Sequence, residues 1–412
     1  MTQMTIPTIS AVNITKSIAY GQTNEQIISI PCISIKLSNG SVFKGDGILN
    51  GSDSIHASHY SALADALTQT LKGKPAADFL PLCEQLSQVR FQIEEWRYPE
   101  PELATAEQSL KKNRRDMLSI LGVVEPKQPE KVLTPVDYPL PAAIIRGTTA
   151  ALLRAAADAQ EQTLLGFVQT LLKSPSDLEK PLQLGLDVSL ASHQPLLNHA
   201  SALCYSVPAA SGAESLGKSS EKFQKYLRQL NSWIDESWPH KDAADRPLLF
   251  IDLNGSIHRL NGNVSGKTLG SLFGFSTTGN QERMIFANSI IGDTPLKTVN
   301  DTKLLQSLVK SRKLKLKLAA ANDTNSIAKV GLWLRECKPE LIVLKDAEIP
   351  NLGEWVKIIQ TIHSNQTPLI LIGESVGNSR SWELIHTIAT VAAPEFYIPA
   401  GGKQGFMEVV NR

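Results

Sequence analysis

The chain has 412 residues, of which 42% are hydrophobic and 20% charged, a composition typical of a soluble globular protein long enough for two domains. Its 41 basic and 40 acidic side chains leave a formal charge of +1. This balance gives no electrostatic support for nucleic acid or an anionic membrane surface as a partner. No segment reaches the roughly 18 unbroken apolar residues of a membrane span.

The cysteines and the N-terminal residues indicate the cellular compartment of the protein. The four cysteines, Cys32, Cys83, Cys204 and Cys337, are isolated, with no C-x-x-C pair and no histidine at metal-binding spacing. We expect them to be reduced and buried as small hydrophobic side chains. The amino terminus lacks the basic start and apolar core of a signal peptide. These features predict a cytoplasmic protein.

Residues 1–175 carry the signals of a mixed α+β domain. Residues 27–37 alternate between apolar and polar, a Ser-Asn-Gly turn follows, and residues 41–47 return, which predicts a hairpin. Helical periodicity predicts further elements. The predicted helices lie at residues 60–71, 79–89, 141–159 and 164–173, and the third is rich in alanine, which allows close packing.

The segment 93–139 differs from its surroundings, with several prolines and many charges. It predicts an inserted surface excursion that contains one amphipathic helix over residues 104–121. The domain boundary is expected near Ser174-Pro175, where the last helix of the first domain ends.

Residues 176–412 contain eight apolar runs separated by helical stretches, which predicts a (β/α)8 barrel. An open doubly wound sheet is the alternative, but it needs a glycine-rich phosphate loop, and the spacing in residues 262–268 is wrong for one. The predicted strands lie at residues 182–188, 202–207, 248–252, 284–290, 314–320, 341–345, 369–373 and 395–398.

Asp252 ends the third of these runs, between Pro247 and the turn residues Asn254-Gly255. A carboxylate at a strand end lies where the loops of an α/β barrel meet, which is the usual place for a catalytic or metal-binding group. The alternative is an aspartate that caps the turn or helix that follows. His258, His363 and His386 have no metal-binding spacing and are interpreted as surface or capping residues.

Five segments resemble those of one known enzyme family. Residues 247–257 are similar to an Ile-Asp-x-x-Gly-x-Ile segment, and residues 349–353 resemble a Lys-Thr-Pro-Asp-Leu-Gly motif. Residues 372–381 are similar to a Gly-Gly-Thr-Cys to Asn-Arg-Ser loop, residues 185–234 to the approach to a third strand, and residues 399–407 to a C-terminal loop. Taken in chain order, these motifs resemble those of the methylaspartate ammonia-lyase family of the enolase superfamily. The resemblance is that of a divergent member.

The resemblance implies an α+β capping domain followed by a barrel, a homodimer, and a small amino acid or carboxylate as substrate. It implies magnesium-assisted removal of a weakly acidic proton and elimination of ammonia from a 3-methylaspartate-like amino acid, giving an unsaturated, mesaconate-like dicarboxylate. In this chemistry the cation stabilises the charge that builds on the substrate carboxylate, and a lysine or histidine takes the proton.

The superfamily pattern implies three acidic magnesium ligands, at the ends of the third, fourth and fifth strands. Asp252 matches the first. Asn288 falls at the second position and could offer an amide oxygen, while Ala321 falls at the third, with Asp323 two residues on. A site with a single carboxylate should hold Mg²⁺ poorly, because Mg²⁺ prefers carboxylate and water oxygens.

The other site positions match the family only in part. Lys345 ends the sixth strand and is the match for the lysine base, although an ungapped count from Pro350 gives Glu348. Ser206 falls where the family has a histidine, and His199 lies seven residues earlier. The positions that bind a substrate carboxylate hold Glu374 and Ser375, and an acidic residue there would repel a dicarboxylate.

Three hypotheses therefore stand. The first is a carbon–nitrogen lyase of the methylaspartate ammonia-lyase type, with Asp252 on the metal and Lys345 as base. The second is an enolase-superfamily barrel with a degraded metal site, acting as a binding or structural subunit or on an altered substrate. The third is a different enzyme that uses Lys345 without a metal. The residues at the metal positions favour the second.

Overall fold

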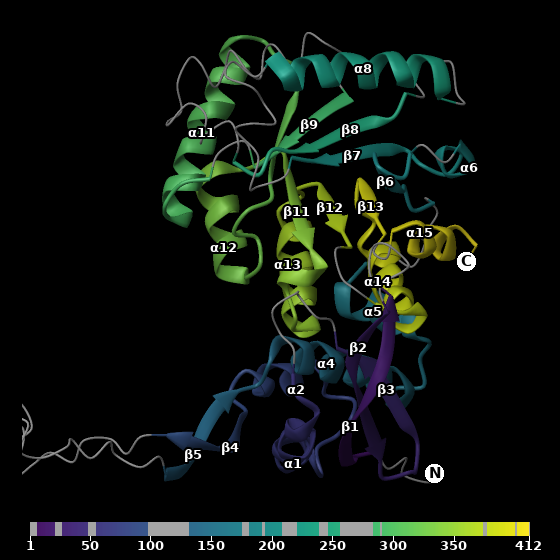
Figure 1. The fold of residues 1–412 in the computed structure, drawn as a ribbon, viewed down its shortest axis with the longest axis vertical. Coiled ribbons are helices and arrows are strands. Elements are labelled where there is room, and N and C mark those ends of the chain that lie inside the picture. Colours follow the sequence, from purple (N-terminus) through teal and green to yellow (C-terminus); the bar gives the residue numbers. More distant parts are fainter. Residues whose placement is uncertain are drawn as a thin grey trace, which may run out of the picture.

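The protein combines a three-stranded N-terminal antiparallel sheet, packed with helices, and an eight-stranded parallel barrel (Figure 1). The structure is a computed structural model. It describes residues 6–20, 27–47, 55–97, 132–174, 181–191, 194–207, 221–238, 246–255, 283–288, 291–373, 377–399 and 402–411.

The N-terminal sheet has the order β1-β2-β3, with β1 (Ile9–Tyr20), β2 (Ile27–Leu37) and β3 (Val42–Asp46). Strands β2 and β3 form the predicted hairpin, and Gly40 in its turn has a φ of 91°, a conformation that glycine adopts without strain. Strand β1 was not predicted. Its register shifts between Ile9 and Ala11, so its buried side chains do not alternate strictly.

The four predicted helices of this region are confirmed. They are α1 (Tyr60–Leu71), α2 (Phe79–Leu86), α4 (Ala142–Ala159) and α5 (Leu164–Leu172), and a 3-10 turn, η1 (Ala57–His59), precedes α1. Helix α4 is buried along most of its length and lies against β2 and β3. Its close approach requires glycine on both sides, because a Cβ at Gly45 would overlap the carbonyl oxygen of Gly147.

The segment 93–139 includes parts of two strands that were not predicted. Its two ends belong to strands β4 (Arg90–Arg97) and β5 (Val132–Pro139), which pair antiparallel in a two-stranded sheet. The proline-rich, charged composition concealed this pairing. Pro135 and Pro139 are tolerated in β5 because β4 is its one neighbour among the described strands. The predicted helix over residues 104–121 lies outside the described residues.

The barrel confirms all eight predicted strands. They are β6 (Gly185–Asp187), β7 (Ala202–Ser206), β8 (Leu248–Asp252), β9 (Met284–Ala287), β10 (Lys317–Ala320), β11 (Leu341–Lys345), β12 (Leu369–Ile372) and β13 (Phe396–Ile398). Each pairs in parallel with the next along the chain. Tyr397 N donates to Gln183 O at 2.8 Å and brings β13 beside β6. This near-closure excludes the open-sheet alternative and confirms the enolase-like fold.

Alternating side chains along the barrel strands separate two cores. Phe250 points inward and meets Phe396 edge-on, with ring centroids 5.7 Å apart. Its neighbours Leu249 and Ile251 point outward into the larger core under the helices. All four cysteines are buried and free, as predicted.

The helices of the barrel region begin with α6 (Gln194–Leu197), α8 (Glu221–Ser237), α11 (Pro295–Ser311) and α12 (Ile327–Leu332). They continue with α13 (Leu352–Ser364), α14 (Ser379–Ala392) and α15 (Gly402–Val410). A π turn, η4 (Trp333–Cys337), extends α12, and a 3-10 turn, η5 (Asp346–Glu348), follows β11. Among the described residues, no helix combines the length and apolar character needed to cross a membrane.

Candidate functional site

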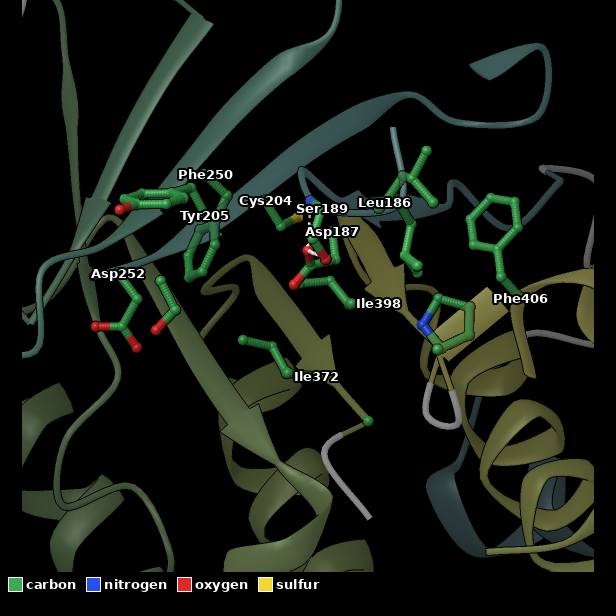
Figure 2. Close-up of a pocket in the computed structure, with 16 residues that line it drawn as sticks. Leu186, Asp187, Ser189, Cys204, Tyr205, Phe250, Asp252, Ile372, Ile398 and Phe406 are labelled. Carbon is green, nitrogen blue, oxygen red and sulfur yellow. Dashed lines mark hydrogen bonds between the residues drawn. The ribbon is translucent and has the colours of Figure 1, made fainter. Parts of the chain in front are cut away.

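A cavity of about 470 Å³ opens at the carboxyl ends of β6, β7, β8, β12 and β13, within the size range of small-molecule sites. Its apolar wall includes Leu186, Phe250, Ile372, Ile398 and Phe406, and its polar groups include Asp187, Ser189, Tyr205, Ser206 and Asp252. Figure 2 shows Asp252 and Phe406 at opposite ends, with Asp187 and Ser189 between them.

Asp252 is 3% exposed and both of its carboxylate oxygens are engaged. Oδ1 accepts hydrogen bonds from the backbone nitrogen of Asn254 and from Nδ2 of Asn288, each at 2.9 Å. Oδ2 lies 3.5 Å from Nζ of Lys345. The bond from Asn254 shows that Asp252 does fix the turn after β8, while the other two partners join it to neighbouring strands.

Lys345 ends β11, the sixth strand of the barrel, where the sequence predicted it. Its side chain is 13% exposed and faces the carboxylate of Asp252, which comes from the third strand. Glu348, the alternative from the ungapped count, is exposed in η5. The structure therefore brings Asp252 and Lys345 together and leaves Glu348 outside this cluster.

Asn288 follows β9 and is 8% exposed. Its φ of 48° is left-handed, a conformation that asparagine tolerates better than most residues. The amide orientation follows from charge, since the NH₂ group and not the oxygen must face the carboxylate of Asp252. Oδ1 of Asn288 is buried and has no hydrogen-bond partner among the described residues.

Asp323 does not join this cluster. It lies after β10, where Oδ1 pairs with Nζ of Lys329 at 2.9 Å and Oδ2 accepts from Nδ2 of Asn322 at 3.1 Å. Ala321, at the aligned position, is buried and offers no side-chain donor. In the described part of the chain, no three His, Cys, Asp or Glu side chains gather as a metal site would require.

Ser206 ends β7 beside Asp252 in the strand register and lines the cavity. Its Oγ accepts a hydrogen bond from Nδ2 of Asn254 at 3.1 Å. His199 is exposed in the turn that precedes β7, at the opposite end of that strand. Glu374 and Ser375 lie outside the described residues, although Gly373 beside them lines the cavity.

Two of the three histidines that lack metal-binding spacing lie within the described residues. Nε2 of His363 lies 3.0 Å from the carbonyl oxygen of Ala392, the last residue of α14, so this histidine caps a helix end as interpreted. His386 lies within α14 with its ring centroid 6.4 Å from that of Tyr397. His258 lies outside the described residues.

Sequence reasoning missed Asp187 and Ser189. Asp187 ends β6, and its Oδ1 accepts hydrogen bonds from the backbone nitrogen of Ser189 at 2.7 Å and from the Ser189 hydroxyl. Its side chain enters the cavity (Figure 2). The signal was available, because Asp187 is a carboxylate at the end of a predicted strand, as Asp252 is. Burial and the charge of Asp187 raise the pKa of Cys204, which therefore stays a neutral thiol.

The donor set at the rim suits an internal ion pair better than a magnesium ion. Mg²⁺ needs several oxygen ligands in octahedral array. Of the three positions at which the resemblance implies acidic ligands, only Asp252 is acidic, and the ammonium of Lys345 lies beside it. The Asn288 amide turns its NH₂ group toward Asp252, so only its remaining oxygen could serve as a donor.

Solved structures share this fold across nearly the whole chain. Methylaspartate ammonia-lyase from Citrobacter amalonaticus, solved with (2S,3S)-3-methylaspartic acid, matches with a TM-score of 0.71 at 15% identity, covering 98% of this chain and 96% of that one. A magnesium complex of β-methylaspartase from Clostridium tetanomorphum matches with a TM-score of 0.70 at 14% identity, covering 98% and 97%. The TM-scores and coverage show a shared fold.

A more distant match is a mandelate racemase/muconate lactonizing protein from Herpetosiphon aurantiacus, with a TM-score of 0.59 at 13% identity, covering 96% of this chain and 89% of that one. No family model matches the sequence, and no curated protein does. The enolase-like architecture is thus shown by structure, while the reaction must be argued from the rim residues.

Proposed function

We propose that the rim cavity binds a small molecule with an ammonium group and an apolar body, without magnesium-dependent elimination of ammonia. The observation that carries this proposal is the engagement of Asp252, whose two oxygens are already held by Asn254, Asn288 and Lys345. A cation that took Asp252 as its ligand would have to displace the lysine ammonium from a nearly buried position.

The charges on the cavity wall support an ammonium group as the ligand's polar part. Among the described residues, the carboxylate of Asp187 accepts hydrogen bonds from Ser189 and pairs with no basic side chain. Asp252 is balanced by Lys345, so the described wall carries one uncompensated carboxylate. A positively charged ligand gains from this carboxylate, whereas a dicarboxylate is repelled by it. Phe250 and Ile398 offer an apolar surface beside Asp187.

Lys345 would act on such a ligand through Asp252, because its ammonium pairs with that carboxylate, which lines the cavity. Ser206 lines the same rim and supplies a hydroxyl. Both roles follow from position. Ser206 lies beside Asp252 on the neighbouring strand, and Lys345 faces Asp252 from the end of β11. A homodimer, implied by resemblance, stays a prediction.

A second candidate is magnesium-assisted elimination of ammonia from a 3-methylaspartate-like amino acid, giving a mesaconate-like dicarboxylate. The meeting of Asp252 and Lys345 across the barrel favours it, because an acidic group and a lysine base at these two strand ends are what the resemblance implies. In that reaction the metal would stabilise charge on the substrate carboxylate. The poor donor set at Asn288, Ala321 and Asp323 weighs against it.

Thermal unfolding in the presence of graded ligands tests the first proposal, since a ligand that binds only the folded state raises Tm. Primary amines with small apolar bodies should raise Tm, the matched alcohols should not, and Asp187→Asn should abolish the amine effect. Glu348→Gln, an exposed change outside the cavity, is the control and should leave it intact. A rise caused by dicarboxylates alone would contradict the proposal.

The second candidate has a separate readout. Incubation of the purified chain with 3-methylaspartate and Mg²⁺ would produce the ultraviolet absorbance of a conjugated diacid if the elimination takes place. We expect no increase. An increase that Asp252→Ala and Lys345→Ala both abolish would establish the elimination and overturn the first proposal.

A further inference from the structure

The segment that follows Lys345, residues 346–351, lies against the N-terminal helices α2 and α4, which Figure 1 shows beneath β11 and α13. Three links hold it there. Nη1 of Arg146 donates to the carbonyl oxygen of Ile349 at 3.3 Å. Thr149 Oγ1 lies 3.5 Å from the carbonyl oxygen of Pro350, and Asn351 Nδ2 donates to the carbonyl oxygen of Cys83 at 2.9 Å. The loop after β11 is thus fastened to the N-terminal part of the chain.

Arg146 is the charged member of these links, and it is 2% exposed. Its guanidinium carbon lies 5.4 Å from the centroid of the Trp355 ring, at cation–π range. Burial lowers the pKa of Arg146, and the charge of Asp346 opposes that effect. An arginine stays protonated at such sites, so its charge requires a nearby anion. The charge of Asp346, itself 1% exposed, offsets part of the cost of burying this guanidinium.

Asp346 follows Lys345 directly in the chain, and this adjacency connects α4 to the rim. Strand β11 ends at Lys345, and η5 begins at Asp346. The backbone nitrogen of Ile349 donates to the carbonyl oxygen of Asp346 at 3.4 Å and closes this turn. A residue that holds Ile349 therefore also restrains the backbone from which the lysine side chain reaches Asp252. Nη2 of Arg146 is buried without a hydrogen-bond partner among the described residues. Burial of this guanidinium group costs stability that a methionine of similar size would not cost.

We infer that Arg146 is a positioning residue which, from α4, holds the segment after β11 at Ile349 and so keeps Lys345 against Asp252. The inference rests on the proposed importance of the Lys345–Asp252 pair, but it concerns the geometry of that pair and not the ligand. A purely structural Arg146 would fasten the two parts of the chain without any effect on Lys345. The two roles differ in what they predict for the exposure of the lysine amine.

The test is the rate of reductive methylation of Lys345 in the folded, ligand-free chain, followed by mass spectrometry of the peptide that contains it. We expect Arg146→Met to raise the rate about fivefold or more, as the loss of roughly 1 kcal/mol of restraint would do. Asp346→Asn should change it in the same direction, because the charge of Asp346 offsets part of the cost of burying Arg146.

Arg154→Met is the matched control. Arg154 also lies on α4 and also reaches the barrel region, donating from Nη2 to the carbonyl oxygen of Arg380 at 2.8 Å, but it contacts α14 and not the loop after β11. It should lower Tm without changing the Lys345 rate. Equal rates in Arg146→Met and wild type, or an equal rise in Arg154→Met, would overturn the inference.

Two further variants keep the test decisive if Arg146→Met does not fold. Arg146→Lys retains a positive charge but loses the second arm of the guanidinium, and we expect an intermediate rate. Rates unchanged from wild type in both Arg146→Lys and Asp346→Asn would then contradict the inference. Because no ligand is present, these results do not depend on whether the cavity binds an amine.

Discussion

Nζ of Lys345 lies 3.5 Å from Oδ2 of Asp252, although the two residues end different strands of the barrel. Both side chains are largely shielded from solvent, at 13% and 4% exposure. An ion pair in such a place stabilises little in net terms, but the loss of one partner leaves a buried, uncompensated charge. The pair therefore fixes the geometry of the rim more than it adds to stability.

Removal of either partner should be costly, and removal of both should be less so. We expect Lys345→Met to lower the free energy of unfolding by about 3 kcal/mol. Asp252→Asn should cost less, because an amide can still accept from Asn254. In the double variant the losses should be clearly less than additive, as measured by urea unfolding.

Lys329→Met supplies the comparison, since it breaks the more exposed pair between Lys329 and Asp323. This change should cost no more than about 1 kcal/mol. Strict additivity at Lys345 and Asp252 would show that the two side chains do not interact.

The contact between Gly45 and α4 predicts a large steric effect from one methyl group. A Cβ at Gly45 would overlap the carbonyl oxygen of Gly147 and lie 2.5 Å from the backbone nitrogen of Ala151. Gly45→Ala should lower the free energy of unfolding by about 2 kcal/mol or more. Gly331→Ala, where the added Cβ meets nothing within 4 Å, should be neutral or stabilising. Equal denaturation midpoints for the two variants would refute the predicted contact.

His363 predicts a pH dependence of stability. Burial lowers its pKa, and its neutral Nε2–H donates to the carbonyl oxygen of Ala392. Between the lowered folded pKa and the unfolded value near 6.5, the unfolded chain binds more protons, so stability rises with pH. The contribution is complete above about pH 6.5 and is lost as the pH falls through that window.

Comparison of variants isolates this histidine. The difference in free energy of unfolding between wild type and His363→Gln should shrink as the pH is lowered from neutral through this window. Urea unfolding at several pH values measures it. A difference that stays constant with pH would show that His363 titrates alike in the folded and unfolded chains.

The barrel was largely predictable, because parallel strands buried on both faces appear as short apolar runs with sharp ends. Residues 248–252 and 341–345 were predicted with the bounds that the structure shows. Strand β1 escaped because its register shift breaks the alternation of buried side chains. Strands β4 and β5 escaped because charge and proline content outweighed a pairing between residues far apart in the chain.

The sequence could predict individual residues of the site but not the contacts between them. Asp252 and Lys345 were both expected at strand ends, yet their ion pair depends on the directions of two side chains across the barrel, which no pattern in the sequence carries. Likewise, Asn288 has a left-handed backbone, and the charge of Asp252 turns the NH₂ group of its side chain toward the carboxylate. Asp187 was overlooked although the argument applied to Asp252 applies equally to it.

We propose that the carboxylate of Asp252 holds the ammonium of Lys345 and not a metal ion. Titration of the purified, ligand-free chain with Mg²⁺, followed by Tm, tests it most directly, because a specifically bound ion must stabilise the folded state. Our account predicts no saturable rise in Tm for the wild type or for Asp252→Asn. A saturable rise in the wild type that Asp252→Asn abolishes would contradict it.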